Sequence, residues 1–257
     1  MKVVLFCGGK GIRLRRGGST LPKPLVRIGT RPILWHVMKY YAHYGHTDFI
    51  LCLGYKAELI KRFFLNYDEC VSNDFTLSEG GERLEMFRKD IADWRITFIN
   101  TGLNASIGQR LHAVRDLLAG ETEFLANYAD GLTDLPLPAM IEDMRRADAT
   151  AGFVSVRPMQ SFHVVRTGPD NRVTSIDPMA QADIWINGGY FYLKQAIFDH
   201  LHPGEELVEQ PFERLITQKK LMAYKYEGFW ASMDTFKDKQ LLETMHSEGR
   251  AVWKVWP

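Results

Sequence analysis

Residues 2–16 of the 257-residue chain read KVVLFCGGKGIRLRR. The run VVLF is short, apolar and rich in β-branched residues, which is typical of a buried β-strand. The loop that follows it, residues 7–16, contains three glycines and four cationic side chains. Glycine lets a ligand come close to the backbone, and clustered cations favour a negative partner. The stretch therefore predicts a strand followed by an anion-binding loop.

Two common phosphate-binding loops do not fit this stretch. In the dinucleotide fingerprint G-x-G-x-x-G, Leu14 stands where the third glycine is required. No acidic residue follows about 20 positions later to hold a ribose hydroxyl, which weighs against an oxidoreductase. A Walker loop requires Ser or Thr after Gly-Lys, whereas Gly11 follows Lys10 here.

The remaining pattern is GGxGxRL at residues 8–14, followed by Pro-Lys-Pro at residues 22–24. Backbone N–H groups of such a loop can line a phosphate, while Arg13 and Lys23 neutralise its charge. The flanking prolines stiffen the backbone that carries Lys23. A flexible surface loop is the alternative interpretation of the glycines.

Strands and helices alternate through the first half of the chain. Apolar strand patterns occupy residues 2–6, 48–55, 95–100 and 123–131, and helix patterns occupy residues 32–45, 56–67, 106–120 and 137–148. This alternation predicts an α/β fold with a Rossmann-like, mostly parallel central sheet and helices on both faces. Ligands bind such sheets at the carboxyl ends of the strands, where the glycine loop and the sequence YADG (residues 128–131) both lie.

The second half adds a smaller antiparallel portion. Strand patterns at residues 161–167 and 172–176 are joined by the turn sequence GPDN, and further strands are expected over residues 149–156, 185–193 and 220–230. Helices are expected over residues 195–201, 208–218 and 234–249, whereas residues 67–94 are polar and weakly periodic, as in an insertion or an oligomer contact. We expect one domain over residues 1–257, with one half to about residue 150 and a second half with a tail over residues 151–257.

The charge is unevenly distributed. Residues 1–47 carry nine Lys and Arg and no acidic residue, although the net charge of the whole chain is only +1. A folded basic region on an otherwise acidic chain favours a compact polyanion, such as a nucleoside triphosphate, over a nucleic acid. A solvated basic face is the alternative.

Composition indicates a cytoplasmic globular protein. The three cysteines are widely spaced and form neither a disulfide framework nor a zinc pattern. No apolar run approaches the roughly 20 residues that cross a membrane, and the N-terminal apolar run is too short for a signal peptide. We therefore expect no membrane partner.

Residues 8–38 resemble the signature of sugar-1-phosphate nucleotidyltransferases, and several later strings resemble glucose-1-phosphate cytidylyltransferases in particular. These strings are WHVMKYYAHYG, DFILCLGYK, YADGLTD, WINGGYFYL, PFERL, LMAYKYEGFWASMDT and AVWKVW. They occur in the family's order over nearly the whole chain. The resemblance implies the nucleotide-diphospho-sugar transferase fold and transfer of a cytidylyl group from CTP to a phosphorylated acceptor.

The resemblance also implies a set of site residues. Asp130 and Asp234 would hold Mg²⁺ against the triphosphate, although taken alone the first is more often a turn and the second more often a helix N-cap. Arg13 and Lys23 would be the catalytic cations. The nucleotide would contact Phe6, Cys7, Gly8, Gly9, Gly11, Gly108, Arg110 and Asp130, and the acceptor would contact His163, Asn187 and Gly188.

The chemistry expected from these groups is in-line attack by an acceptor phosphate oxygen on the α-phosphorus of CTP, with release of pyrophosphate. Two anions must be brought together, so the protein's task is to position and neutralise them. A catalytically silent nucleotide-binding scaffold is a further alternative. Trp253 and Trp256 near the end of the chain need cover, either on the domain or on another subunit, and we expect a homo-oligomer.

The chain departs from the family pattern around the acceptor. Ile12, Ile107 and Gln109 replace family residues near the nucleotide, so another nucleotide remains an alternative to CTP. The family's Glu-Lys-Pro before WINGG is absent, and no lysine occurs between Lys89 and Lys194. His163 replaces a small glycine. We therefore expect either another cation in place of the missing lysine or an altered acceptor, including a modified sugar phosphate or a non-sugar phosphate or phosphonate. The candidate replacement cations are Arg157, Arg166 and Arg172.

Overall fold

A computed structural model of the chain describes residues 1–9, 21–158 and 162–256. A seven-stranded sheet with the strand order β14-β10-β13-β8-β1-β4-β7 crosses its centre. The strands are β1 (Val3–Phe6), β4 (Asp48–Leu53), β7 (Arg95–Asn100), β8 (Glu123–Asn127), β10 (Ala151–Val156), β13 (Ile186–Lys194) and β14 (Leu221–Tyr226). β13 pairs antiparallel with both of its neighbours, whereas every other pair in this sheet is parallel. The expected mostly parallel α/β sheet is confirmed.

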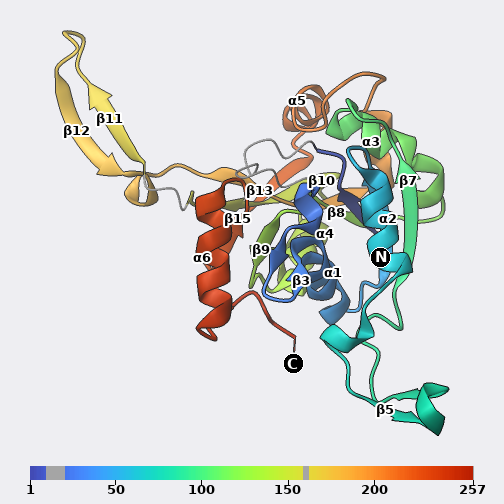
Figure 1. The fold of residues 1–257 in the computed structure, drawn as a ribbon. Coiled ribbons are helices and arrows are strands. Elements are labelled where there is room, and N and C mark those ends of the chain that lie inside the picture. The colour runs from blue at the N-terminus through green and yellow to red at the C-terminus, as the bar shows by residue number, and fades with distance from the viewer. Residues whose placement is uncertain (10–20, 159–161, 257) are drawn as a thin grey trace.

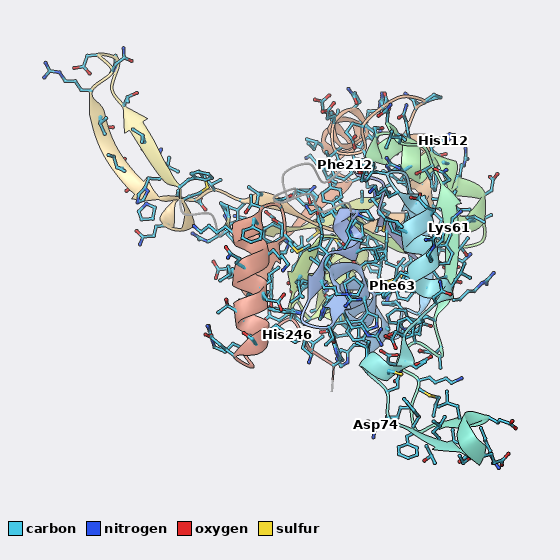
Figure 2. The ribbon with its side chains drawn as sticks, viewed as in Figure 1. Lys61, Phe63, Asp74, His112, Phe212 and His246 are labelled. Atoms are coloured by element: carbon cyan, nitrogen blue, oxygen red, sulfur yellow. The ribbon has the colours of Figure 1, made fainter. Side chains whose placement is uncertain are left out.

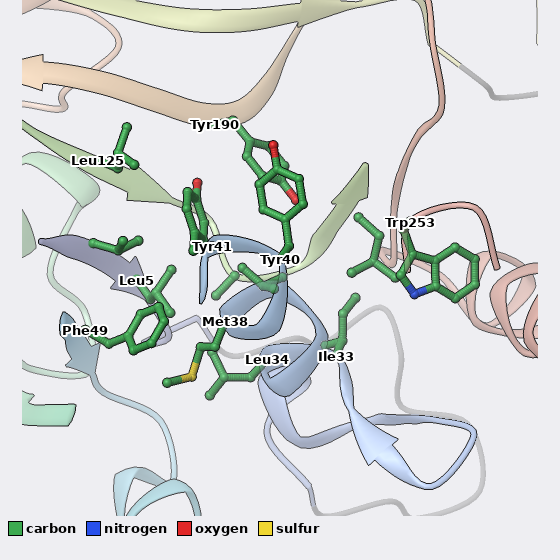
Figure 3. Packing of buried hydrophobic residues seen from close by; sticks show 14 of the residues in the cluster. Leu5, Ile33, Leu34, Met38, Tyr40, Tyr41, Phe49, Leu125, Tyr190 and Trp253 are labelled. Atoms are coloured by element: carbon green, nitrogen blue, oxygen red, sulfur yellow. The ribbon is translucent and has the colours of Figure 1, made fainter. Parts of the chain in front are cut away.

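Helices cover both faces of the sheet because buried strand residues alternate between the two sides. In β1, Val3 and Leu5 join one apolar cluster, and Val4 and Phe6 join the other. The helices are α1 (Ile33–His43), α2 (Ala57–Leu65), α3 (Ile107–Ala113), α4 (Leu137–Arg146), α5 (Gln210–Thr217) and α6 (Phe236–Ser247). Buried residues of α1, α2 and α4 belong to the first cluster, part of which Figure 3 shows, and those of α3 and α5 belong to the second.

Short elements connect these layers. The two-residue strands β2 (Arg27–Ile28) and β3 (Arg31–Pro32) pair with each other, as do β9 (Gly131–Thr133) and β15 (Trp230–Ser232). The 3-10 helices are η2 (Lys23–Leu25), η3 (Glu69–Val71), η4 (Glu79–Gly81), η5 (Arg115–Leu118), η6 (Met179–Gln181) and η7 (Gln195–Asp199). The helix expected over residues 195–201 is therefore a 3-10 turn.

Two hairpins extend from the body in different directions (Figure 1). One is formed by β5 (Phe75–Ser78) and β6 (Arg83–Met86), within the segment whose sequence is weakly periodic. The other is formed by β11 (His163–Thr167) and β12 (Val173–Pro178), joined at the predicted GPDN turn, where Asn171 has a φ of 61°. Side chains of both hairpins project away from the body in Figure 2, which labels Asp74 beside the first.

The C-terminal segment packs against the body of its own chain. Trp253 and Trp256 are 1% and 8% exposed, and the ring of Trp256 meets Trp35 of α1 edge to face at 5.9 Å. Phe229 stacks on Trp253 with ring centroids 5.7 Å apart. These tryptophans were expected to be covered either by the domain or by another subunit, and in the structure the domain of the same chain covers them.

Candidate active site

Lys23, Asp130 and Asp234 meet at one point, although they are far apart in the sequence. The Lys23 ammonium donates to Asp130 Oδ2 at 2.6 Å and to Asp234 Oδ1 at 2.7 Å. Lys23 is the first residue of η2, between Pro22 and Pro24, so its backbone is restrained on both sides. The two carboxylates thus converge on a single cation.

Local backbone geometry brings Asp130 to this point. The chain turns sharply after β8, where Ala129 has a φ of 63° and its N–H donates to the Asn127 side chain at 2.7 Å. A left-handed conformation is uncommon for alanine and occurs where surrounding contacts enforce it. Gly131 then starts β9, so Asp130 lies between the turn and a strand.

Pairing of β9 with β15 brings Asp234 to Asp130. Ser232 is opposite Gly131 in this pair, and the Met233 N–H donates to the Asp130 carbonyl oxygen at 2.9 Å. The N-cap of α6 is Thr235, in a capping box with Asp238, so Asp234 is not the cap. Its second carboxylate oxygen instead accepts a hydrogen bond from Ser232 Oγ at 2.8 Å.

The electrostatics of the three groups are mutually dependent. Burial raises the pKa of Asp130 above its ordinary value, and the Lys23 ammonium opposes that rise. Burial alone would lower the pKa of Lys23, but the two carboxylates outweigh it, and the pKa lies above the ordinary value. The charged form of Lys23 is therefore favoured, and its ammonium opposes the protonation of Asp130.

The donor set fits a magnesium ion shared with phosphate. Two carboxylates, one directly before β9 and one shortly after β15, already converge within hydrogen-bonding distance of one cation. Among the described residues, no group of three or more His, Cys, Asp or Glu forms a closed metal cage. Magnesium commonly takes one or two carboxylates and completes its shell with water and phosphate oxygens, which matches this arrangement.

The described start of the glycine loop, residues 7–9, follows the carboxyl end of β1, and Arg110 contacts it at Gly8. This buried guanidinium donates to Leu53 O at 3.2 Å, Thr101 Oγ1 at 2.7 Å and Gly8 O at 3.4 Å. A Cβ atom on Gly8 would lie 2.0 Å from Arg110 Nη1, so a side chain there would displace the guanidinium. Arg110 therefore contacts the loop backbone and holds it in place.

The other nucleotide-site candidates fall into three groups. Phe6 and Cys7 are buried at the end of β1, and burial raises the pKa of the Cys7 thiol, which keeps it protonated. A Cβ atom on Gly108 would lie 2.3 Å from the Glu205 carbonyl oxygen, so the lack of a side chain at Gly108 allows the start of α3 to pack closely against the backbone at Glu205. Gly11 and Arg13 fall within residues 10–20, outside the described residues.

On the acceptor side, Asn187 lies next to the turn that carries Asp130. Its Nδ2 donates to Tyr128 Oη at 3.4 Å, and its Oδ1 accepts from the Gly189 N–H at 2.8 Å, a turn-type contact. The Gly188 carbonyl oxygen accepts from the Trp230 indole at 2.8 Å. These contacts fix β13 against the strand end that leads to Asp130.

The remaining acceptor candidates divide between the sheet and the hairpin. His163 starts β11 and is exposed, opposite Pro178. Arg166 lies on β11, and Arg172 lies in the hairpin turn beside Asp170, 3.1 Å away. Of the three arginines, only Arg157 lies at an end of the central sheet, directly after β10.

One residue has a different role from the one its sequence position indicates. Asp134 resembles a cap for the helix over residues 137–148, but α4 starts after Pro136 without a side-chain cap. The Asp134 carboxylate instead accepts from Tyr226 Oη at 2.5 Å and from the Phe229 N–H at 2.8 Å. It fixes the connection between β14 and β15, upstream of Asp234. Its partners are more than 90 positions away, so no local signal reveals this role.

Comparison with known proteins identifies the family of the chain. Residues 2–246 match the nucleotidyl transferase family, and the chain belongs to that family. It is a nucleotidyltransferase enzyme of the sugar-1-phosphate type.

More particular similarity comes from two bacterial relatives. The chain is 37% identical over its full length, and over the full length of the relative, to the "Probable glucose-1-phosphate cytidylyltransferase" of Bacillus subtilis. The same identity and coverage hold for the glucose-1-phosphate cytidylyltransferase of Salmonella typhimurium. A solved structure of UDP-glucose pyrophosphorylase with UDP-glucose matches 97% of this chain and 99% of its own at a TM-score of 0.69 and 14% identity, which shows a shared fold.

In the described part of the chain, we find no helix with the length and apolar character that crossing a membrane requires.

Proposed function

We propose that the protein transfers a cytidylyl group from CTP to a phosphorylated acceptor, such as glucose 1-phosphate, and releases pyrophosphate. The relatives named glucose-1-phosphate cytidylyltransferase support the choice of nucleotide and acceptor. The observation that carries the proposal is the convergence of Lys23, Asp130 and Asp234 at the carboxyl end of the sheet. A cation and two carboxylates at one point suit a polyphosphate that arrives with a divalent metal.

In the proposed reaction, an oxygen of the acceptor phosphate attacks the α-phosphorus of CTP. The bond from that phosphorus to the bridging oxygen breaks, and pyrophosphate leaves with the electron pair. Lys23 neutralises phosphate charge near the reacting centre, and Arg13 contributes charge toward the leaving pyrophosphate. Asp130 and Asp234 hold Mg²⁺, which supplies further positive charge to the phosphate oxygens when bound.

Within one domain, we assign the nucleotide to residues 1–150 and the acceptor to residues 151–257. The loop of Cys7, Gly8 and Gly9 lies along the nucleotide, and Arg110 holds that loop in position from below. Asn187, beside Tyr128, is placed to donate to an acceptor hydroxyl when its weak 3.4 Å contact is exchanged.

The main alternative concerns the identity of the acceptor. No lysine lies between Lys89 and Lys194, and His163 is exposed on the hairpin. The same chemistry on a modified sugar phosphate, on a non-sugar phosphate or phosphonate, or with another nucleotide is therefore the second candidate.

We further propose that the protein is cytoplasmic and a homo-oligomer. Its cysteines are all free thiols, as a reducing compartment permits. The β11–β12 hairpin exposes apolar side chains that no other element covers in the described structure, with Val165, Val173 and Ile176 between 53% and 60% exposed. Such surface is typical of a contact between subunits. Light scattering on the purified protein measures the subunit number, and a strictly monomeric mass contradicts this part.

The decisive experiment for the function is a pyrophosphate-release screen. CTP, dTTP, UTP, ATP and GTP are each paired with sugar 1-phosphates and non-sugar phosphates in the presence of Mg²⁺. We expect CTP with a phosphorylated acceptor to give the highest kcat/KM. Absence of pyrophosphate from every pair contradicts the proposal and leaves a nucleotide-binding scaffold.

A further inference from the structure

Two cationic side chains share one aromatic ring near the acceptor side of the sheet. The guanidinium carbon of Arg157 lies 5.1 Å from the centre of the Trp185 ring, and the ammonium of Lys225 lies 4.7 Å from it. Arg157 follows β10, Trp185 precedes β13, and Lys225 is on β14. We call these three residues the Trp185 cluster.

Strand register places the Trp185 cluster beside the acceptor-site asparagine. Ser155 of β10 is directly opposite Asn187 on one side and directly opposite Lys225 on the other. Side chains at directly paired positions point to the same face of a sheet, and positions two apart on a strand share that face. One face of the sheet is therefore lined by Asn187, Lys225, Arg157 and Trp185, and the Trp185 cluster lies beside Asn187 on that face.

Two exposed acidic side chains lie at the cluster, namely Glu227 and Asp183, whose Oδ1 accepts from the Trp185 indole at 2.9 Å. Arg157 has one acidic neighbour, Glu227, at 3.6 Å, and the Glu227 side chain is 73% exposed. Such a solvent-exposed pair contributes little and yields readily to another anion. Among the ion pairs of the described residues, none involves Lys225. Two like charges on one ring repel each other, and an anion between them reduces that repulsion.

The position of the cluster determines which anion fits. Adjacent strands are about 4.8 Å apart, so the backbone of Lys225 lies roughly 10 Å from that of Asn187, with Asp130 on the far side of Asn187. The strand order β14-β10-β13-β8 puts Arg157 and Lys225 on the side of Asn187 that is away from Asp130, so an anion held by these cations has the Asn187 strand between it and Asp130. This arrangement suits a molecule with an anionic group at each end and hydroxyls between.

We propose that Arg157 and Lys225, held on Trp185, bind a second anionic group of the acceptor, a carboxylate or a phosphate, at the end opposite to the phosphate that attacks CTP. This inference rests on the proposed cytidylyl transfer and narrows its substrate class to doubly anionic acceptors. The planar guanidinium of Arg157 provides paired donors for such a group, and Lys225 adds a point charge. No covalent bond of this second anionic group forms or breaks in the reaction.

The test compares three acceptors with CTP and Mg²⁺, measured as kcat/KM for pyrophosphate release. Glucose 1-phosphate has no distal charge, glucuronic acid 1-phosphate has a distal carboxylate, and glucose 1,6-bisphosphate has a distal phosphate. We expect at least one doubly anionic acceptor to exceed glucose 1-phosphate by about tenfold to a hundredfold, as charge-assisted hydrogen bonds allow. The better of the two identifies the distal group.

The variant Arg157→Gln/Lys225→Gln should reduce that preference ratio by the same tenfold to hundredfold. A matched control, Arg146→Gln/Lys61→Gln, removes one arginine and one lysine charge from α4 and α2 and should leave the ratio unchanged; Figure 2 labels Lys61. Thermal melts check that both variants fold. If the first does not, the ranking of acceptors by the unaltered protein decides the question.

Three outcomes overturn the inference. Equal turnover of neutral-ended and doubly anionic acceptors shows that no second anion is recognised. Equal loss on all acceptors in Arg157→Gln/Lys225→Gln shows that the cations act elsewhere. Absence of pyrophosphate with all three acceptors also overturns the inference, whereas the proposed function fails only if every pair of the broader screen is silent; turnover of glucose 1-phosphate without preference removes only the inference.

Discussion

Replacing Lys23 by methionine is the most informative single change to this site. Methionine keeps much of the length of the side chain but removes the ammonium that contacts Asp130 at 2.6 Å and Asp234 at 2.7 Å. Two carboxylates then converge on one point without a cation. The change therefore affects both the ligand-free protein and the reaction, and the two effects are measured separately.

The expected magnitudes follow from the contacts. An electrostatic donor to the reacting phosphates contributes about 10²–10³ in rate, so kcat/KM should fall by that factor. Leaving a charged partner unpaired costs about 1–3 kcal/mol. We expect the lower end, because the Asp234 side chain is 41% exposed and is partly solvated. For a chain of this size, 1 kcal/mol lowers Tm by about 2–4 °C.

The assays are pyrophosphate release with CTP and the best acceptor, and thermal unfolding with and without millimolar Mg²⁺. Magnesium should raise the Tm of Lys23→Met more than that of the unaltered protein, because the ion supplies the missing charge between the carboxylates. Lys39→Met is the control, since Lys39 on α1 donates to a backbone carbonyl of Asp90 away from the site. Retention of more than a tenth of kcat/KM in Lys23→Met would refute the catalytic assignment.

Three further changes test other parts of the structure. Gly8→Ala forces a Cβ against Arg110 Nη1. It should raise the KM for CTP at least about tenfold and have a smaller effect on the KM for the acceptor. Equal effects on both KM values would contradict the role of the loop. Asp134→Asn weakens the contacts to Tyr226 and the Phe229 N–H, so urea unfolding should show a loss of about 1–3 kcal/mol, whereas a loss below 0.5 kcal/mol would count against this anchor. Burial lowers the pKa of His36 from 6.5 to about 4. Between these pH values His36 is protonated in the unfolded chain but neutral in the folded chain, so the stability present above pH 6.5 is lost as the pH falls toward 4. His36→Phe should therefore reduce the loss of unfolding free energy between pH 7 and 4.5 by about 2–3 kcal/mol, and an unchanged pH profile would show that His36 is not responsible.

The parts of the fold that follow from local sequence were predictable. The apolar run of β1 and the GPDN turn of the β11–β12 hairpin are specified by short-range patterns, and both occur as expected. The order of the strands is not specified in this way. β14 from the end of the chain pairs with β10 by register and packing between distant segments, and no short pattern encodes that choice.

In the candidate site, too, some features follow from the sequence and others depend on contacts between distant segments. The family resemblance indicated both Asp130 and Asp234, and the flanking prolines drew attention to Lys23. That the two aspartates lie together depends on the β9–β15 pair, which involves three residues in each strand, too few for a local sequence signal. The Trp185 cluster depends on the register of β10 against β13 and β14, so sequence alone offered only Arg157 as one of several cations.

The central claim is that Asp130, Asp234 and Lys23 together bind a metal-bound triphosphate. The most direct measurement is a crystal structure with Mg²⁺ and a non-hydrolysable CTP analogue. The account predicts magnesium at about 2.0–2.1 Å from a carboxylate oxygen of each aspartate, with the Lys23 ammonium on a phosphate oxygen. A triphosphate bound elsewhere, or a magnesium ion that contacts neither aspartate, would contradict it.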